Sequence, residues 1–359
     1  MRVYSSIKFL LLSFLLSSCS SVKDTALPSG EIPTSRPAPV VDFFDPKLRS
    51  QDRRSNSVLL LLPMSGVNAH IGRSVLNACL ISLDNTSDII LYVIDTADTS
   101  LEKFSLPGRF ENLKAIIGPV FANEIKQYST LFFNTPILSL SNNPRINCDH
   151  VFACGLSLQD EIRTLISDAI LRNISGFLVM LPEGKFGDQV LAVLSDELKQ
   201  HGIDDGDGLE VIRYASISRK AATKYAENSE KEAIFIVNPI LDMAKMDGKR
   251  VLTLSSAALA NEEAWSGVIF AYADSEEQRE FIRRYVEVFG VRPSTIAMAG
   301  RDAVETIKDV VNHGKNLLNE EERSGCFGRF SISKKHGFRR ELQIFQIRNG
   351  GKELVELPE

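Results

Sequence analysis

The sequence predicts an α/β fold with two lobes, each built on a parallel sheet with helices on its faces. Short apolar runs that end in polar, Gly or Pro residues, as buried parallel strands do, alternate with segments of helical periodicity. This alternation runs once through the first part of the chain and restarts after Phe152. With 359 residues, 44% of them hydrophobic, the chain is long enough to bury a core in each lobe.

The first lobe is expected to begin with a strand at 58–62, an unbroken run of Val and Leu that Pro63 ends. Segment 72–83 follows, and the helical spacing of its apolar residues predicts a helix with one face packed on the sheet. The same reasoning predicts the remaining elements, which are strands at 89–94, 115–119 and 136–141 and a helix that ends at Phe132.

The second lobe is expected to repeat the pattern. Its predicted elements are helices at 159–172 and 189–201 and strands at 176–181, 210–215, 233–237, 250–254 and 267–271. Helices at 276–289 and 295–318 come next. We expect lobe 1 to comprise about 58–152 and 274–322, and lobe 2 about 153–273 and 323–355. Near the end, Phe327–Ser333 and Glu341–Arg348 alternate apolar and polar residues around the basic turn 334–337, which predicts a β-hairpin.

The N-terminus has the features of an exported lipoprotein. Arg2 and Lys8 precede a short apolar run, and Leu16-Ser17-Ser18-Cys19 resembles the lipobox of bacterial lipoproteins. This resemblance implies removal of residues 1–18 and lipidation of Cys19, which would anchor the chain in a membrane of the envelope. Ser20 resembles the signal for outer-membrane sorting. An ordinary cleaved signal peptide with an incidental cysteine is the alternative. The Pro- and Ser-rich segment 19–57 predicts an extended linker.

Composition and motifs argue against several functions. A formal net charge of −5, which loss of the basic signal makes more negative, gives no general affinity for nucleic acid. The chain has no Gly-x-Ser-x-Gly, His-Glu-x-x-His or phosphate-binding Gly-x-x-x-x-Gly-Lys motif. Cys148, His150 and Cys154 match no standard zinc spacing. The sequence therefore predicts a protein without catalytic residues, cofactor or metal.

One pair of cysteines is close enough in sequence for a disulfide. Cys148 and Cys154 could close a small loop in an oxidising compartment, provided that a turn brings their Cα atoms within about 7 Å. A strand over Val151–Ala153 would hold the two sulfurs too far apart. Both outcomes are open on the sequence alone.

Several loop motifs resemble the type I periplasmic binding-protein fold of the leucine/isoleucine/valine-binding family, over about Val58 to Val355. The resemblance rests on five stretches, in order along the chain: Leu62–Gly66, Asp95–Thr99, Ile116–Pro119, Thr135–Ser139 and Phe289–Pro293. It implies two parallel-sheet lobes joined by interlobe crossovers, with a cleft between them for a small ligand.

Within that superfamily the chain is similar to the penicillin-binding protein activator group of lipoproteins. The stretches that carry this resemblance are Gly118–Ala122, Ser139–Asn143, Phe186-Gly187, Trp265 and Phe270-Ala271. It implies a non-enzymatic, lipid-anchored scaffold that modulates a penicillin-binding peptidoglycan synthase. A solute receptor for an importer or sensor, binding an amino acid or related small molecule, is the alternative. The chain departs from the group at Arg301, where an aromatic residue is common.

The same resemblance places candidate cleft residues at the carboxyl ends of strands, where the fold binds small ligands. They are Ser65, Gly66, Val120, Phe121, Ser139, Ser141, Asn142, Phe186, Gly187, Ser255 and Ser256. Amino-acid receptors of the family usually carry a hydroxyl just after Gly-Pro, where this chain has Val120-Phe121, and this weakens the receptor interpretation. Plain use of the serines in turns and helix caps is the alternative to a ligand role.

Overall fold

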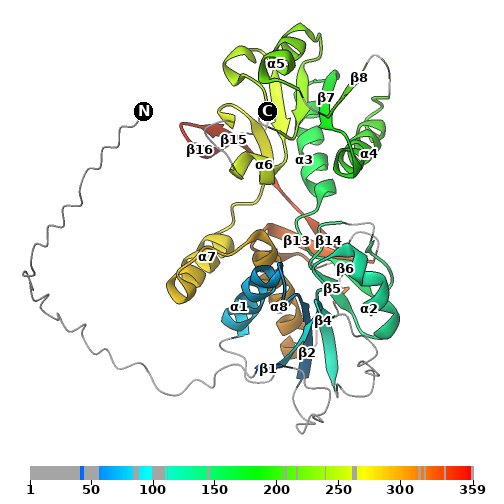
Figure 1. Ribbon diagram of the computed structural model, residues 1–359, viewed down its shortest axis with the longest axis vertical. Helices are drawn as coiled ribbons and strands as arrows, with labels where there is room; N and C mark the ends of the chain where they lie inside the picture. Colours follow the sequence, from blue (N-terminus) through cyan, green and yellow to red (C-terminus); the bar gives the residue numbers. More distant parts are fainter. Residues whose placement is uncertain are drawn as a thin grey trace, which may run out of the picture. The chain divides into compact units, whose positions relative to one another are not determined.

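The structure is a computed structural model of the 359-residue chain (Figure 1). It describes residues 41–43, 56–83, 89–98, 110, 112–143, 146–204, 206, 208–215, 217–238, 240–260, 265–313, 317–318, 321–334 and 337–356. These residues all belong to one unit, Pro37–Glu359. The expected signal peptide, Cys19 and most of the expected linker lie outside the described residues.

The first sheet has six parallel strands in the order β1-β3-β2-β4-β5-β6. Its strands are β1 (Val41–Phe43), β2 (Asn56–Leu62), β3 (Ile89–Asp95), β4 (Leu113–Ile117), β5 (Ile137–Ser139) and β6 (Val151–Ala153). Strand β1 lies within the segment expected to be a linker, so that expectation is wrong for 41–43. It adds to the sheet edge by pairing with β3.

Both faces of this sheet are buried, which explains why β2 is apolar at consecutive positions. Val58, Leu60 and Leu62 belong to the core that also contains residues of α1 (Ala69–Leu83) and α8 (Thr295–His313). Leu59 and Leu61 belong to the opposite core, with residues of α2 (Ile125–Leu131). The short 3-10 helix η2 (Ala122–Glu124) leads into α2.

Helices α1 and α8 pack closely. A Cβ at Gly300 of α8 would lie 2.9 Å from Cγ1 of Val75, so glycine permits this approach. At the far end of the contact, Lys308 Nζ donates to the Ser82 carbonyl of α1 at 2.9 Å. No helix among the described residues is long and apolar enough to cross a bilayer.

The second sheet has seven strands in the order β16-β15-β11-β10-β9-β7-β8. The strands β7 (Phe177–Pro182), β8 (Leu209–Tyr214), β9 (Ala233–Ile236), β10 (Arg250–Thr253) and β11 (Ile269–Tyr272) are parallel. Strands β15 (Gln343–Arg348) and β16 (Gly351–Leu354) join them antiparallel.

Helices cover both faces of the second sheet. One face packs on α3 (Leu158–Leu171) and α4 (Lys185–Gln200), and the other on α5 (Arg219–Asn228) and α6 (Ser255–Ala260), with the 3-10 helix η4 (Met243–Lys245) nearby. The sequence did not predict α5 and α6, because α5 buries only Ala222, Thr223 and Ala226 and shows no strong apolar face.

The C-terminal part differs from the expected hairpin. Strand β13 (Gly328–Ser333) pairs antiparallel with β14 (Gly337–Arg340) and with β12 (Arg323–Gly325), as a separate three-stranded sheet. The turn is where it was predicted, although residues 335 and 336 lie outside the described part. The second strand predicted, Glu341–Arg348, instead contributes β15 to the second sheet, since alternation alone does not specify a partner strand.

The three-stranded sheet packs on the first lobe. Phe327, Phe330, Ile332 and Phe338 are buried in the same core as β2, α1 and α8. The boundary expected at 323 is therefore too early, and we place the return to the second lobe at 341–342. Helix α7 (Glu276–Phe289) contributes Phe281 and Tyr285 to this core as well.

Candidate functional site

Some of the candidate residues of the first lobe line a pocket of about 450 Å³. Its walls come from the loops that follow β2, β3 and β4, which end at the same edge of the sheet. The lining residues are Pro63, Ser65, Gly66, Val67, Asn68, Thr96, Ala97, Phe121, Asn123 and Glu124. Three predicted residues, Ser65, Gly66 and Phe121, thus meet at one site, and the sequence missed Thr96 and Glu124.

Asp95, the last residue of β3, fixes two of these loops. Its Oδ1 accepts hydrogen bonds from the backbone N–H groups of Met64 at 2.8 Å and Ala97 at 3.0 Å. Partial burial works to raise the pKa of Asp95, but the Ser65 side chain and the backbone amides outweigh it and hold that pKa below its ordinary value. The carboxylate therefore keeps the pocket walls in place.

The other candidates of the first lobe are mostly used by the fold itself. Val120 is buried in the first core. The Ser139 hydroxyl is buried and donates to the Pro119 carbonyl at 3.0 Å. The buried Ser141 hydroxyl oxygen accepts from Asn143 N–H at 3.2 Å, and Asn142 is exposed. The two serines thus act in the turn, as the alternative interpretation of the sequence allowed.

In the second lobe, the backbone N–H of the candidate residue Ser255 already donates a hydrogen bond to a carboxylate of the chain itself. Ser255 N–H, at the first residue of α6, donates to Glu161 Oε2 of α3 at 2.6 Å. Both residues are buried, and Ser256 beside them is exposed. Burial raises the pKa of Glu161 to about 7, despite the hydrogen bonds from Ser255 that favour the ionised form.

Phe186 and Gly187 lie in the first turn of helix α4. Phe186 is 51% exposed, whereas Gly187 is buried, and a Cβ there would lie 2.0 Å from the Pro182 carbonyl oxygen. Glycine at 187 therefore lets the helix start directly against the end of β7. This packing role is separate from any ligand contact.

A second buried polar cluster lies where the chain passes between the lobes. The Arg340 side chain is fully buried, and its Nη1 pairs with Asp302 Oδ2 of α8 at 2.9 Å. Its Nη2 donates to the Cys154 carbonyl at 2.7 Å. The guanidinium also lies 4.8 to 5.6 Å from the ring centroids of three phenylalanines, which are Phe327, Phe330 and Phe338.

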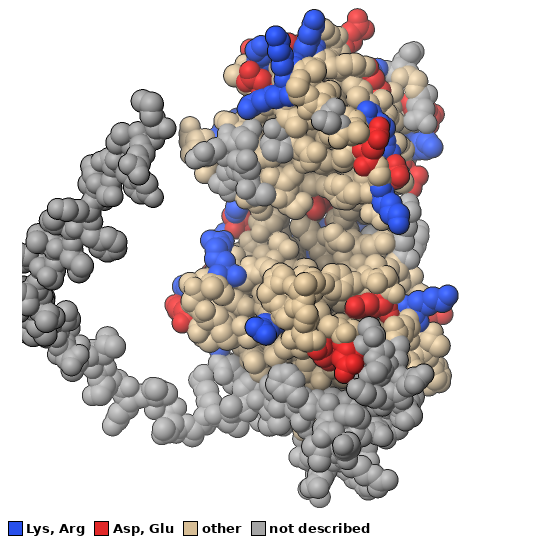
Figure 2. All heavy atoms as spheres, in the orientation of Figure 1, with Lys and Arg blue, Asp and Glu red and all other residues tan. Residues whose placement is uncertain are grey.

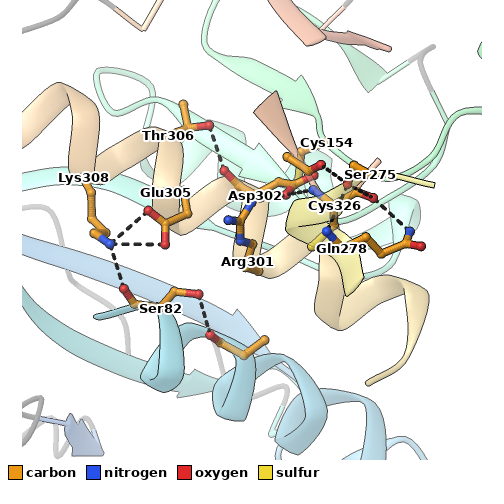
Figure 3. Close-up of polar contacts among 12 residues, drawn as sticks. Ser82, Cys154, Ser275, Gln278, Arg301, Asp302, Glu305, Thr306, Lys308 and Cys326 are labelled. Carbon is orange, nitrogen blue, oxygen red and sulfur yellow. Dashed lines mark hydrogen bonds and ion pairs between the residues drawn. The ribbon is translucent and has the colours of Figure 1, made fainter. Parts of the chain in front are cut away.

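Asp302 joins further segments to this cluster (Figure 3). Its Oδ1 accepts from Cys326 N–H at 2.7 Å and from Arg301 Nη1 at 3.3 Å. The Ser275 hydroxyl, between β11 and α7, donates to the Gly325 carbonyl at 2.9 Å, so this passage is held as well. The passages after β6, after β11 and after β14 therefore share one hydrogen-bonded network. Of its members, the sequence had singled out only Arg301, as a departure from the activator group.

The cysteines near this network are free thiols. Cys148 is exposed, whereas Cys154 is buried and its Sγ donates to the Ser139 carbonyl at 2.9 Å. Burial raises the pKa of the Cys154 thiol to about 12. Strand β6 occupies Val151–Ala153, so the chain is extended ahead of Cys154. Cys148 and Cys154 form no disulfide in the structure. Within the described residues, no group of three or more His, Cys, Asp or Glu side chains is placed to hold a metal ion.

Two α/β lobes with strand-end loops and three connecting passages define a type I periplasmic binding-protein fold. A putative branched-chain amino acid transporter protein from Rhodospirillum rubrum has this fold, with 16% identity, a TM-score of 0.69, and coverage of 84% of this chain and 100% of that one. The chain belongs to the LppC family of putative lipoproteins, whose profile matches residues 46–225.

Structures of LpoA from Haemophilus influenzae are also similar. Its C-domain, described as a regulator of PBP1A, shares 19% identity at a TM-score of 0.67, over 84% of this chain and all of the domain. Full-length LpoA shares 19% identity at a TM-score of 0.66, over 85% of this chain and 60% of LpoA. No curated protein sequence matches this chain.

Proposed function

We propose that this chain is a lipid-anchored, non-enzymatic scaffold that binds a penicillin-binding peptidoglycan synthase and modulates it. One joint observation carries the proposal: membership of the LppC family together with the fold of the LpoA C-domain over that domain's whole length. The matched LpoA is described as a regulator of PBP1A. A regulator acts through binding, so this description supports a role without catalysis.

The buried network between the lobes supports a scaffold of fixed shape. A receptor that closes on its ligand needs its interlobe passages to change their backbone angles. Here one fully buried arginine and one buried aspartate join these passages, and breaking their pair would leave a charge without its partner. The protein is therefore expected to present a constant surface to its partner.

The chemistry of the strand ends disfavours an amino-acid receptor. A ligand carboxylate needs several aimed donors to replace its lost hydration. Ser139 uses its hydroxyl within the turn, Val120 and Phe121 offer no donor side chain, and Ser255 N–H is bound to Glu161. The alternative, a solute receptor, keeps the first-lobe pocket and the fold shared with the branched-chain amino acid transporter protein in its favour.

We place the protein in the bacterial envelope, facing the periplasm. The support is the family description as a putative lipoprotein and the lipobox that ends at Cys19. Anchorage through Cys19 and sorting to the outer membrane, indicated by Ser20, belong to the same proposal. Cys19→Ala is expected to give a folded protein that no longer sediments with membranes, and a folded variant that still sediments would contradict the anchor.

Pull-down tests the scaffold function directly. The chain without its lipid, immobilised and exposed to solubilised envelope proteins, should enrich a penicillin-binding synthase over an unrelated lipoprotein as control. Addition of the chain to that purified synthase should then change its rate of glycan polymerisation or cross-linking. Absence of both enrichment and rate change would overturn the proposal. A thermal-shift response to leucine or another neutral amino acid would instead favour the solute receptor.

A further inference from the structure

We propose that a second pocket of this chain binds a small carboxylate that also carries hydroxyl groups, such as a sugar acid. The pocket has a volume of about 580 Å³, which suits a small molecule. It is lined by Arg163 and Thr164 of α3, by Glu322 ahead of β12, by residues of β13 and β14, and by the segment that leads on to β15. It shares no residue with the pocket at the strand ends, and the inference does not depend on the synthase as partner.

The pocket presents guanidinium groups from both lobes. Arg163 comes from α3 of the second lobe, where it pairs with Asp160, and Arg339 comes from β14, whose sheet packs on the first lobe. Arg339 is exposed, and its side chain makes no hydrogen bond or ion pair with any other described residue. Ser331 of β13 lies directly opposite Arg339, so its hydroxyl is on the same face of the sheet. These groups can hold a carboxylate through several hydrogen bonds, and the ligand would then contact both lobes.

Arg340 leaves one buried donor of the pocket without a partner. Its side chain is fully buried, and Nη1 and Nη2 are both used within the fold. Its Nε is buried as well and makes no hydrogen bond within the part of the chain that the structure describes. Buried donors are normally paired. Because Arg340 also lines the pocket, an oxygen of a bound ligand would satisfy this donor.

The charge balance of the pocket favours a ligand with a single negative charge. Glu322 and Glu341 also line the pocket, and Arg329 Nη1 lies 3.3 Å from Glu322 Oε2, while its Nη2 lies 2.7 Å from Glu341 Oε2. The two glutamates would repel a doubly charged phosphate, whereas the unpaired Arg339 balances one carboxylate. Their oxygens are acceptors, so hydroxyl groups of the same ligand can donate to them. The pocket therefore suits a hydroxylated carboxylate better than a phosphate.

The wider surface adds no attraction of this kind. On the face shown in Figure 2, basic and acidic side chains are interspersed and uncharged residues cover most of the surface. Such a mixture does not steer anions toward the protein over a long range. Selection of a carboxylate therefore depends on the groups that line the pocket.

Calorimetry and thermal shift with gluconate test this inference, because gluconate carries one carboxylate and several hydroxyl groups. The chain without its lipid is titrated up to about 10 mM, and saturable binding with a rise in Tm is expected. Sorbitol, which lacks the carboxylate, hexanoate, which lacks the hydroxyl groups, and inorganic phosphate should each bind at least tenfold more weakly. No saturable binding of gluconate, or equal binding of any of the three comparison compounds, would overturn the inference without any variant.

Matched variants locate the site. Arg339→Gln removes the unpaired guanidinium and should weaken gluconate binding at least tenfold, and Ser331→Ala should weaken it about threefold. Arg219→Gln is the control for the loss of one positive charge, because Arg219 is exposed on α5 and lies outside the pocket. Circular dichroism melts establish that the variants fold. Unchanged binding in folded Arg339→Gln, or an equal loss in Arg219→Gln, would contradict the inference.

Discussion

Glu161 should make the fold less stable as the pH rises. Burial raises its pKa to about 7 from an ordinary value of 4.5, so the folded chain holds this proton more tightly than the unfolded chain does. Stability linked to Glu161 is then complete below pH 4.5 and is lost as the pH rises through 7. At about 1.4 kcal/mol per pKa unit, the free energy of unfolding should fall by about 3 kcal/mol across this interval.

Glu161→Gln isolates the effect from the other titrating groups. Glutamine is neutral at every pH, and its carbonyl oxygen can still accept the hydrogen bond from Ser255 N–H. Urea titrations between pH 4.5 and 8.5 give the free energy of unfolding of both proteins. The value for the variant minus the value for the wild type should grow by about 3 kcal/mol from the lowest pH to the highest, because only the wild type loses this stability. Glu183→Gln, an exposed position, should show no such trend. Parallel curves for wild type and Glu161→Gln would refute the reasoning.

Three further changes test the packing. Arg340→Met removes the cation that pairs with Asp302 Oδ2 and leaves Arg301 on Oδ1, so it should lower the free energy of unfolding by about 3 kcal/mol in urea; addition of Asp302→Asn should restore part of it, and an additive double variant would contradict the ion pair. Gly187→Ala places a Cβ against a backbone carbonyl and should cost about 1 to 3 kcal/mol by the same titration, whereas Gly351→Ala, where the nearest atom is 3.9 Å away, should cost less than about 1. Cys148 should react with iodoacetamide in the native protein, while the other thiols of the described part react only after unfolding; mass spectrometry reads both, and a blocked Cys148 would contradict its exposure.

The sequence predicted the elements whose signal is local. The strand β2 and the helix α1 were found because a run of consecutive apolar residues and a helical spacing of apolar residues each specify one kind of element. Helix α5 was missed because alanines form most of its buried face, and alanine differs little in hydrophobicity from the neighbouring residues. Strand β1 was missed because three residues in a Pro-rich segment are too few to show an alternation of apolar and polar positions.

The site was less predictable, because its decisive contacts join distant residues. Fold resemblance located the loops that hold Ser65 and Phe121, but nothing local distinguishes a ligand serine from Ser139, whose hydroxyl is used in a turn. The bond between Glu161 and Ser255 spans 94 positions, and the bond between Arg340 and Asp302 spans 38. A buried charge in a helix is visible in the sequence only as another charged residue, so its partner cannot be inferred without the fold.

Residues 326–347 follow most of both lobes in the sequence, yet they complete the core of one lobe and the sheet of the other. Phe327 and Phe338 complete the core that β2 begins, while Ile344 and β15 complete the second sheet. A chain that emerges N-terminus first therefore cannot finish either lobe until residues 326–347 have emerged. During that time the apolar residues of β2 lack part of their covering. The two lobes, although separate as sheets, should be acquired in a single late step.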